Sequence, residues 1–201
     1  MEEKKYFDRQ IDESLLAWKN SPRHKPLLLR GARQVGKSSS VHHLARQFDN
    51  FVEINFERRP AYLEIFQGDR DAKHIVEMIK SITGKPIVPG KTLLFFDEIQ
   101  MCQEAISSLR FFWEDMPELH VIAAGSLLEF ALNEIPTFGV GRIHSMFMYP
   151  MSFDEFLNAL GMTSLQHQKR EASMDRPLLS ALHEQLVALF RTYLMVGGMP
   201  E

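Results

Sequence analysis

Apolar positions along the chain fall into two patterns, short continuous runs and helically spaced sets. Runs or alternations typical of strands lie at residues 27–29, 51–56, 93–96, 119–124 and 143–148. Helical spacing is found at residues 7–18, 41–48, 61–66, 72–82, 103–115, 127–133, 153–160 and 178–194. Strands that alternate with helices predict an α/β fold, in which helices cover both faces of a parallel sheet.

The last part of the chain carries helical patterns only, from Ser152 to a strong breaker at Gly197–Pro200. We therefore expect two parts, a core at residues 1–151 that includes an N-terminal helix, and a helical lid at residues 152–201 packed at one end of the sheet. Hydrophobic residues make up 45% of the 201 positions, which is enough for a substantial core.

Composition narrows the possible partners. The chain has 23 Lys and Arg against 26 Asp and Glu, and this balance argues against purely electrostatic nucleic-acid binding by this segment, without deciding the question. Cys102 is the single cysteine, so neither an intrachain disulfide nor a cysteine cage for a metal is possible. Neither a signal peptide nor an apolar run of membrane-spanning length occurs, so we expect a cytosolic protein without a membrane partner.

A phosphate-binding motif follows the first strand. Residues 31–38 read Gly-Ala-Arg-Gln-Val-Gly-Lys-Ser and match G-x-x-x-x-G-K-[ST], with a strand before and a helix after. The backbone N–H groups and the helix N-terminus favour an anion, Lys37 is expected at the β- and γ-phosphates, and Ser38 at Mg²⁺. The residues expected to contact ATP are Gly31, Ala32, Arg33, Gln34, Val35, Gly36, Lys37, Ser38 and Ser39.

An acidic pair, Asp97 and Glu98, ends the strand at residues 93–96. In a parallel sheet that end lies on the same side as the phosphate-binding loop. We expect Asp97 to hold Mg²⁺ together with Ser38, and Glu98 to act as the general base on the attacking water. The pair lacks the glycine of a Ras-type GTPase, and no Asn-Lys-x-Asp motif follows, which favours ATP hydrolysis.

Two further residues have two readings each. Ser126 follows the fourth strand, where it would orient the attacking water, or would simply cap the helix expected at residues 127–133. Arg142 precedes the fifth strand, where its guanidinium would neutralise charge on the transferred phosphoryl group of a neighbouring subunit, or would be an ordinary loop residue.

With the loop at 31–38, Asp97-Glu98, Ser126 and Arg142 in this order, the chain resembles an AAA+ ATPase. It is more specifically similar to a prokaryotic family of AAA ATPases, through the stretches at residues 30–38, 96–100, 124–126, 141–142, 149–156 and 197–201. The resemblance implies a P-loop NTPase fold with strand order 5-1-4-3-2. It also implies that Ser126 is a sensor residue and that Arg142 is an arginine finger.

The resemblance also sets expectations about partners. Members of this family usually carry a further C-terminal domain, so the chain looks like the N-terminal ATPase part, with a homo-oligomer or that domain as its partner. Many AAA+ proteins have a second sensor arginine within a Gly-Ala-Arg signature on a lid helix. The expected lid of this chain does not contain the signature, and Arg176 and Arg191 remain equal candidates for the role. Beside Mg-dependent ATP hydrolysis, two alternatives stay open: a nucleotide-dependent switch with little turnover, and a DNA-processing accessory.

Overall fold

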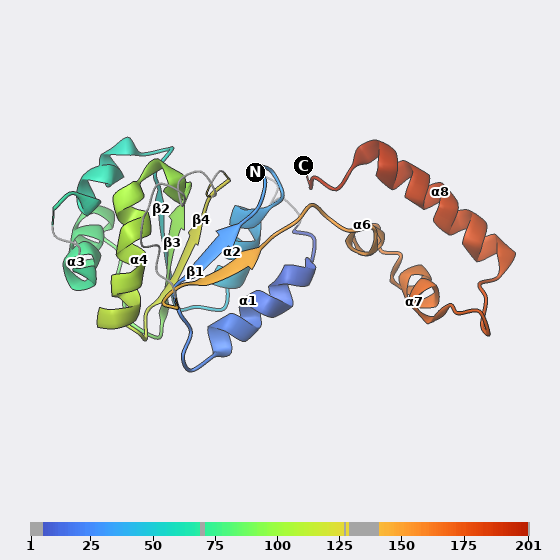
Figure 1. The fold of residues 1–201 in the computed structure, drawn as a ribbon, viewed down its shortest axis with the longest axis horizontal. Helices are drawn as coiled ribbons and strands as arrows, with labels where there is room; N and C mark the ends of the chain where they lie inside the picture. Colours follow the sequence, from blue (N-terminus) through green and yellow to red (C-terminus); the bar gives the residue numbers. More distant parts are fainter. Residues whose placement is uncertain (1–5, 69–70, 127, 129–140, 201) are drawn as a thin grey trace.

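The computed structural model describes residues 6–68, 71–126, 128 and 141–200 and has a parallel five-stranded sheet at its centre (Figure 1). The strands are β1 (Leu27–Arg30), β2 (Asn50–Asn55), β3 (Thr92–Asp97), β4 (His120–Ala124) and β5 (His144–Phe147). Their spatial order is β2-β3-β4-β1-β5, and every neighbouring pair is parallel. Read from the other edge, this is the order 5-1-4-3-2, so the expected fold class is confirmed.

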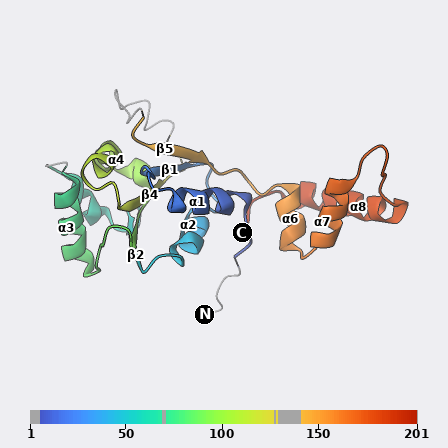
Figure 2. The ribbon, with the colours of Figure 1, turned by 90° about the horizontal axis from the view of Figure 1, so that it is seen from below.

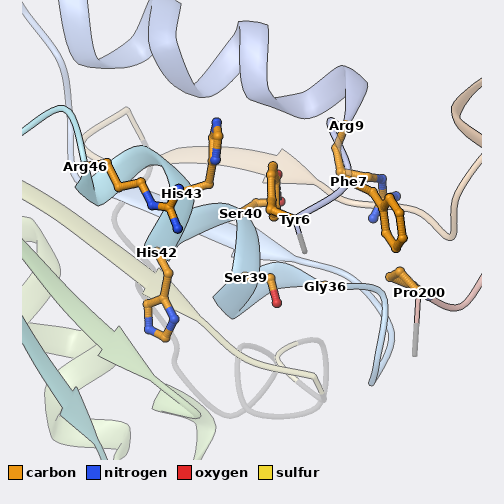
Figure 3. Close-up of a pocket in the computed structure, with 10 residues that line it drawn as sticks. All are labelled: Tyr6, Phe7, Arg9, Gly36, Ser39, Ser40, His42, His43, Arg46 and Pro200. Carbon is orange, nitrogen blue, oxygen red and sulfur yellow. Dashed lines mark hydrogen bonds between the residues drawn. The ribbon is translucent and has the colours of Figure 1, made fainter. Parts of the chain in front are cut away.

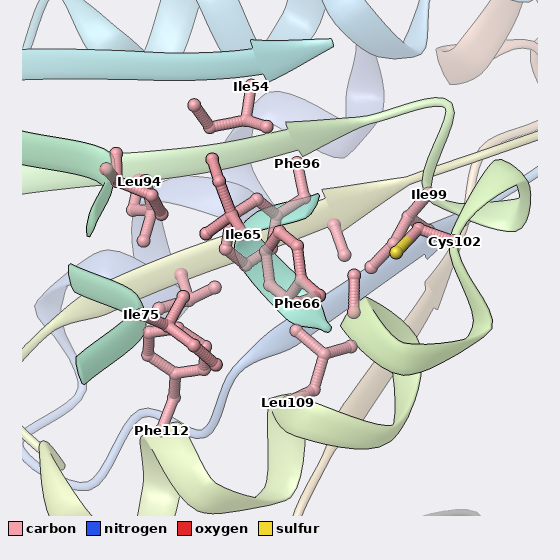
Figure 4. Close-up of a cluster of buried hydrophobic side chains, with 14 of the residues drawn as sticks. Ile54, Ile65, Phe66, Ile75, Leu94, Phe96, Ile99, Cys102, Leu109 and Phe112 are labelled. Atoms are coloured by element: carbon pink, nitrogen blue, oxygen red, sulfur yellow. The ribbon is translucent and has the colours of Figure 1, made fainter. Parts of the chain in front are cut away.

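The strand β3 shows why its sequence is a continuous apolar run. All of its residues are buried. Leu94 and Phe96 point into one hydrophobic layer, drawn in Figure 4, while Leu93 and Phe95 point into the layer on the opposite face. Because both faces of β3 are covered, the positions between Thr92 and Asp97 are all apolar.

Helices cover the two faces of the sheet, as Figure 1 shows. On one face lie α1 (Gln10–Asn20) and α2 (Lys37–Ala45), and on the other lie η1 (Pro60–Phe66), α3 (Ala72–Thr83), η2 (Ile99–Met101) and α4 (Gln103–Asp115). The segment expected to be helical at residues 61–66 is a 3₁₀ helix, a form common in short connecting turns. The helix expected at residues 127–133 lies outside the described residues, apart from Leu128.

Three helices lie beyond the sheet at one end of the molecule: α6 (Phe153–Ala159), α7 (Thr163–Glu171) and α8 (Ser180–Val196) (Figures 1 and 2). They share a small core of their own around Leu157, Leu165 and Leu186. Sequence patterning missed α7, because this helix is mostly polar and buries few residues. The division into a core and a lid at residue 152 stays a prediction.

None of the described helices is both long enough and apolar enough to pass through a lipid bilayer. The cytosolic location expected from the sequence stays a prediction.

Candidate functional site

The loop at residues 31–38 connects β1 to α2 at the carboxyl edge of the sheet. Its backbone takes positive φ angles at Gly31 (147°), Gln34 (63°) and Gly36 (98°). A Cβ atom on Gly31 would lie 2.2 Å from the carbonyl oxygen of Met148, so this position admits no side chain. Gly36 is the N-cap of α2 in the left-handed region, where glycine avoids the strain of other residues. Steric constraints therefore explain why glycine occupies both positions of the motif.

Lys37 is buried, and its ammonium group turns back onto its own loop. Nζ donates hydrogen bonds to the carbonyl oxygens of Gly31 at 2.9 Å and Ala32 at 2.7 Å. Burial lowers the pKa of Lys37, while the carboxylates of Glu98 and Asp97 act in the opposite direction. The structure thus places a cation inside the loop, close to the two predicted acidic residues.

The two predicted metal ligands are in contact. Ser38 Oγ donates to the carboxylate of Asp97, at 3.1 Å from Oδ1 and 3.3 Å from Oδ2. Asn55, at the end of β2, donates from Nδ2 to Oδ2 of Asp97 at 2.8 Å. Burial raises the pKa of Asp97, the carboxylates of Glu98 and Glu53 raise it further, and the Ser38 hydroxyl opposes them.

Sequence reasoning missed Asn55, although its position carried a signal. It is a polar residue at the carboxyl end of a parallel strand, and such ends gather at one edge of the sheet.

Glu98 follows Asp97 with a backbone φ of 53°, in the left-handed region. Its Oε2 accepts a hydrogen bond of 2.5 Å from Nε2 of Gln100, which lies on η2. Gln100 in turn lies against Gly125, at the end of β4. The sequence predicted the place of Glu98 but gave no role to Gln100.

Ser126 lies on the same edge of the sheet, directly after β4 and Gly125. Its Oγ is buried and has no hydrogen-bond partner among the described residues. Since the helix that it was expected to cap is outside those residues, neither of its two readings is tested.

Arg142 lies at the opposite side of the sheet, where the strands begin. The parallel register pairs Leu27 with His144 and Arg30 with Phe147, so the residues before β5 lie level with the start of β1 and away from the loop. Arg142 is exposed, and its Nε is paired with Glu114 of α4. The structure therefore does not bring Arg142 to the loop of its own chain. Arg33, within the loop, is also exposed, at 3.9 Å from Glu57.

A cavity of about 590 Å³ lies beside the loop (Figure 3). It is lined by Tyr6, Phe7, Arg9, Gly36, Ser39, Ser40, His42, His43, Arg46 and Pro200. Phe7 and Pro200 lie at one end, and His42 and Arg46 lie at the other (Figure 3). The rings of Tyr6 and His43 are stacked, with centroids 4.2 Å apart. Of this lining, only Gly36 and Ser39 were expected. Ser40, His42, His43 and Arg46 follow them on or directly after α2, whereas the rest of the lining comes from the two ends of the chain, which only tertiary packing brings to the loop.

Arg9 fixes the N-terminal segment to this loop. Its guanidinium donates to the carbonyl oxygen of Val35 at 2.7 Å, to that of Tyr149 at 2.8 Å, and to Oε1 of Glu155 at 3.0 Å. These contacts connect the loop, the segment after β5 and the start of α6 through one buried side chain.

Comparisons with known proteins bear on the family and the fold. A model of the AAA domain family matches residues 23–157, whereas no curated protein matches the chain. The fold is similar to ORC2 of Aeropyrum pernix, solved as ADPNP and ADP complexes, with a TM-score of 0.52 and 13% identity over 96% of this chain and 66% of that one. It is also similar to Aeropyrum pernix ORC1 in complex with DNA (TM-score 0.49, 15% identity, 78% and 47% coverage). A further similar structure is PCH-2 of C. elegans (0.48, 12%, 87% and 52%).

The chain accordingly spans about two thirds or less of the length of these proteins. The family match covers most of the chain and includes the loop, β3 and β4. The parallel sheet in the order β2-β3-β4-β1-β5 is the P-loop NTPase arrangement. This chain therefore belongs to the AAA domain family and contains a nucleotide-binding module of the AAA+ type.

Proposed function

We propose that the chain binds ATP with Mg²⁺ and hydrolyses it to ADP and phosphate. The observation that carries the proposal is the contact between Ser38 and Asp97, which joins the loop after β1 to the end of β3. A hydroxyl and a carboxylate oxygen are the hard ligands that Mg²⁺ prefers. Burial raises the pKa of Asp97, and a bound cation would favour the charged form of this carboxylate.

The loop and the cavity beside it would then bind different parts of ATP. Lys37 would exchange its bonds to Gly31 and Ala32 for bonds to phosphate oxygens, which its flexible stem permits. Backbone N–H groups of the loop and the N-terminus of α2 would hold the same phosphates. The cavity beside the loop has the volume of an ordinary small-ligand site, and its aromatic rings from Tyr6, Phe7 and His43 suit a nucleoside.

Hydrolysis needs a base next to the phosphate. The oxygen of a water molecule attacks the γ-phosphorus, the bond to the β-phosphate oxygen breaks, and the water proton passes to the carboxylate of Glu98. Ser38 and Asp97 would hold Mg²⁺, which would supply charge neutralisation for the phosphates. Ser126 would orient the water or the γ-phosphate from the end of β4, and Arg142 would reach the site of a neighbouring copy.

The test is ATP binding by calorimetry and phosphate release by the purified chain, beside Lys37→Ala and Glu98→Gln. We expect Lys37→Ala to lose binding, and Glu98→Gln to keep binding while turnover falls about 100-fold or more. Ser164→Ala, an exposed serine of α7 outside the loop and the cavity, is the matched control. ATP binding without turnover would leave the switch as the function, and no binding by a folded chain would refute the proposal.

A further inference from the structure

The carboxylate of Glu98 is held by a residue only two positions further along the chain. Glu98 is in the left-handed region, and η2 follows directly, so the chain turns back and brings Gln100 beside it. Nε2 of Gln100 donates to Oε2 of Glu98 at 2.5 Å. Since one oxygen of a carboxylate accepts this bond, the other is left for the proton of the attacking water.

Gln100 itself is confined on its other side. A Cβ atom on Gly125 would lie 2.1 Å from Oε1 of Gln100 and 3.2 Å from its Cδ. Any residue except glycine at position 125 would therefore displace the amide. This explains the glycine at the end of β4 without reference to backbone conformation, because Gly125 does not have a positive φ.

The amide is also poorly placed for a purely structural role. Oε1 of Gln100 is buried without a hydrogen-bond donor among the described residues, and Oγ of Ser126, the residue after Gly125, is buried there without a partner as well. Buried polar atoms without partners reduce stability, so each calls for an explanation. Here the Gln100 amide donates to Glu98, the proposed catalytic base.

We propose that Gln100 is a positioning residue for ATP hydrolysis: its amide fixes the orientation of the Glu98 carboxylate, and Gly125 leaves the space that the amide requires. This inference rests on the proposed function, because it assigns Gln100 a part in the same reaction. Charged groups that interact with Glu98 include the ammonium group of Lys37 and the carboxylate of Asp97.

The first test compares Gln100→Leu and Gln100→Glu with the wild-type chain. Misplacement of a general base costs about 10- to 100-fold in kcat, whereas the KM for ATP should stay within about threefold. Gln100→Leu removes the donor. Gln100→Glu keeps the shape but places a second carboxylate beside Glu98, and such a pair retains a proton to higher pH. The acidic limb of its kcat profile should therefore move to higher pH.

The matched control is Gln168→Leu, an exposed glutamine of α7. Unchanged kcat in both Gln100 variants would overturn the proposal. A loss of kcat that comes with an equal loss of ATP affinity, and with no change in the pH profile of Gln100→Glu, would also overturn it. That pattern belongs to a structural residue.

A double-mutant cycle checks the role of Gly125 separately. Gly125→Ala should lower kcat about as much as Gln100→Ala, because its methyl group displaces the amide. In the Gln100→Ala background the colliding atom is gone, so the second substitution should add little. Losses that multiply would contradict the proposal. Turnover that is lost in Glu98→Gln but unchanged in the Gln100 variants contradicts this inference alone. A wild-type chain without turnover contradicts both the proposed hydrolysis and this inference.

Discussion

Arg9 and Glu155 form a buried ion pair across 146 positions of sequence, with 3.0 Å between Nε and Oε1. Glu155 also accepts from the backbone N–H groups of Gln10 at 2.8 Å and Ser152 at 2.6 Å. Burial by itself raises the pKa of Glu155, but these N–H groups and the guanidinium of Arg9 outweigh it and hold the pKa below its usual value. The start of α6 is thereby tied to the segment that precedes α1.

Removal of one partner of this pair should destabilise the fold strongly. Glu155→Gln leaves the Arg9 guanidinium buried without its counter-charge, and such changes cost about 3–5 kcal/mol of unfolding free energy. Denaturant unfolding measures this value. The control is Glu77→Gln, which breaks an exposed pair with Lys80 on α3 and should cost less than about 1 kcal/mol. Equal losses in the two variants would show that the buried pair has no special weight.

Ser38→Ala should remove the dependence of ATP binding on Mg²⁺. The hydroxyl now bonded to Asp97 is the proposed metal ligand, and its loss should weaken Mg-ATP binding by roughly tenfold or more. Calorimetry with Mg²⁺ and with a chelator gives the two affinities. Ser164→Ala changes an exposed serine of α7 outside the loop and should behave as wild type. If ATP binding by Ser38→Ala depends on Mg²⁺ as strongly as in the wild type, Ser38 is not a ligand of the metal.

Arg142 should act only on a neighbouring copy. Arg142 lies level with the start of β1, whereas the phosphate-binding loop follows the end of β1. The two are roughly 15 Å apart along the strand, which is beyond the reach of an arginine side chain. We expect specific activity to rise with protein concentration, and Arg142→Ala to bind ATP but turn over about 10³-fold more slowly.

A mixture of Arg142→Ala and Glu98→Gln separates the two readings of this arginine. If sites are shared between copies, some mixed sites contain both an intact Glu98 and an intact Arg142, and activity returns. Glu114→Gln removes the partner of Arg142 without removing the guanidinium, and should remain active. A mixture that assembles and stays inactive counts against a shared site.

Acid should destabilise the fold through His120 at the start of β4. Its ring is stacked on His24 with centroids 3.7 Å apart, and burial lowers the pKa of His120 to about 4, although the Lys19 carbonyl oxygen accepts from it. An unfolded histidine has a pKa of about 6.5, so the unfolded chain binds the proton first. Stability is complete above that pH and falls as the pH drops from about 6.5 towards 4.

The expected loss between pH 7.5 and pH 5 is about 1–2 kcal/mol from this residue. His120→Phe keeps an aromatic ring against Trp18 and Phe48 but cannot titrate, so its unfolding free energy should change less over the same interval. Chemical denaturation at the two pH values measures the difference. The same slope in both chains would assign the acid sensitivity to other groups.

The sequence by itself determined the parts of the site that depend on local order. The loop at residues 31–38 has a fixed spacing, and the strands before it and before Asp97 are apolar runs that lie in the middle of a covered sheet. Because parallel strands place their carboxyl ends on one edge, the meeting of Ser38 with Asp97 followed from the pattern. The strand order came from the family resemblance, and the hydrogen-bond ladder confirms it.

Tertiary structure alone decided which polar side chains complete the site. Asn55 meets Asp97, Gln100 meets Gly125, and Arg9 meets Glu155, and none of these pairs leaves a periodic trace in the chain. Hydrophobic periodicity records which face of an element is buried, whereas a hydrogen bond between distant segments depends on the exact place and direction of two atoms. That information exists only once the segments have packed, and for this reason the cavity beside the loop was also beyond the sequence.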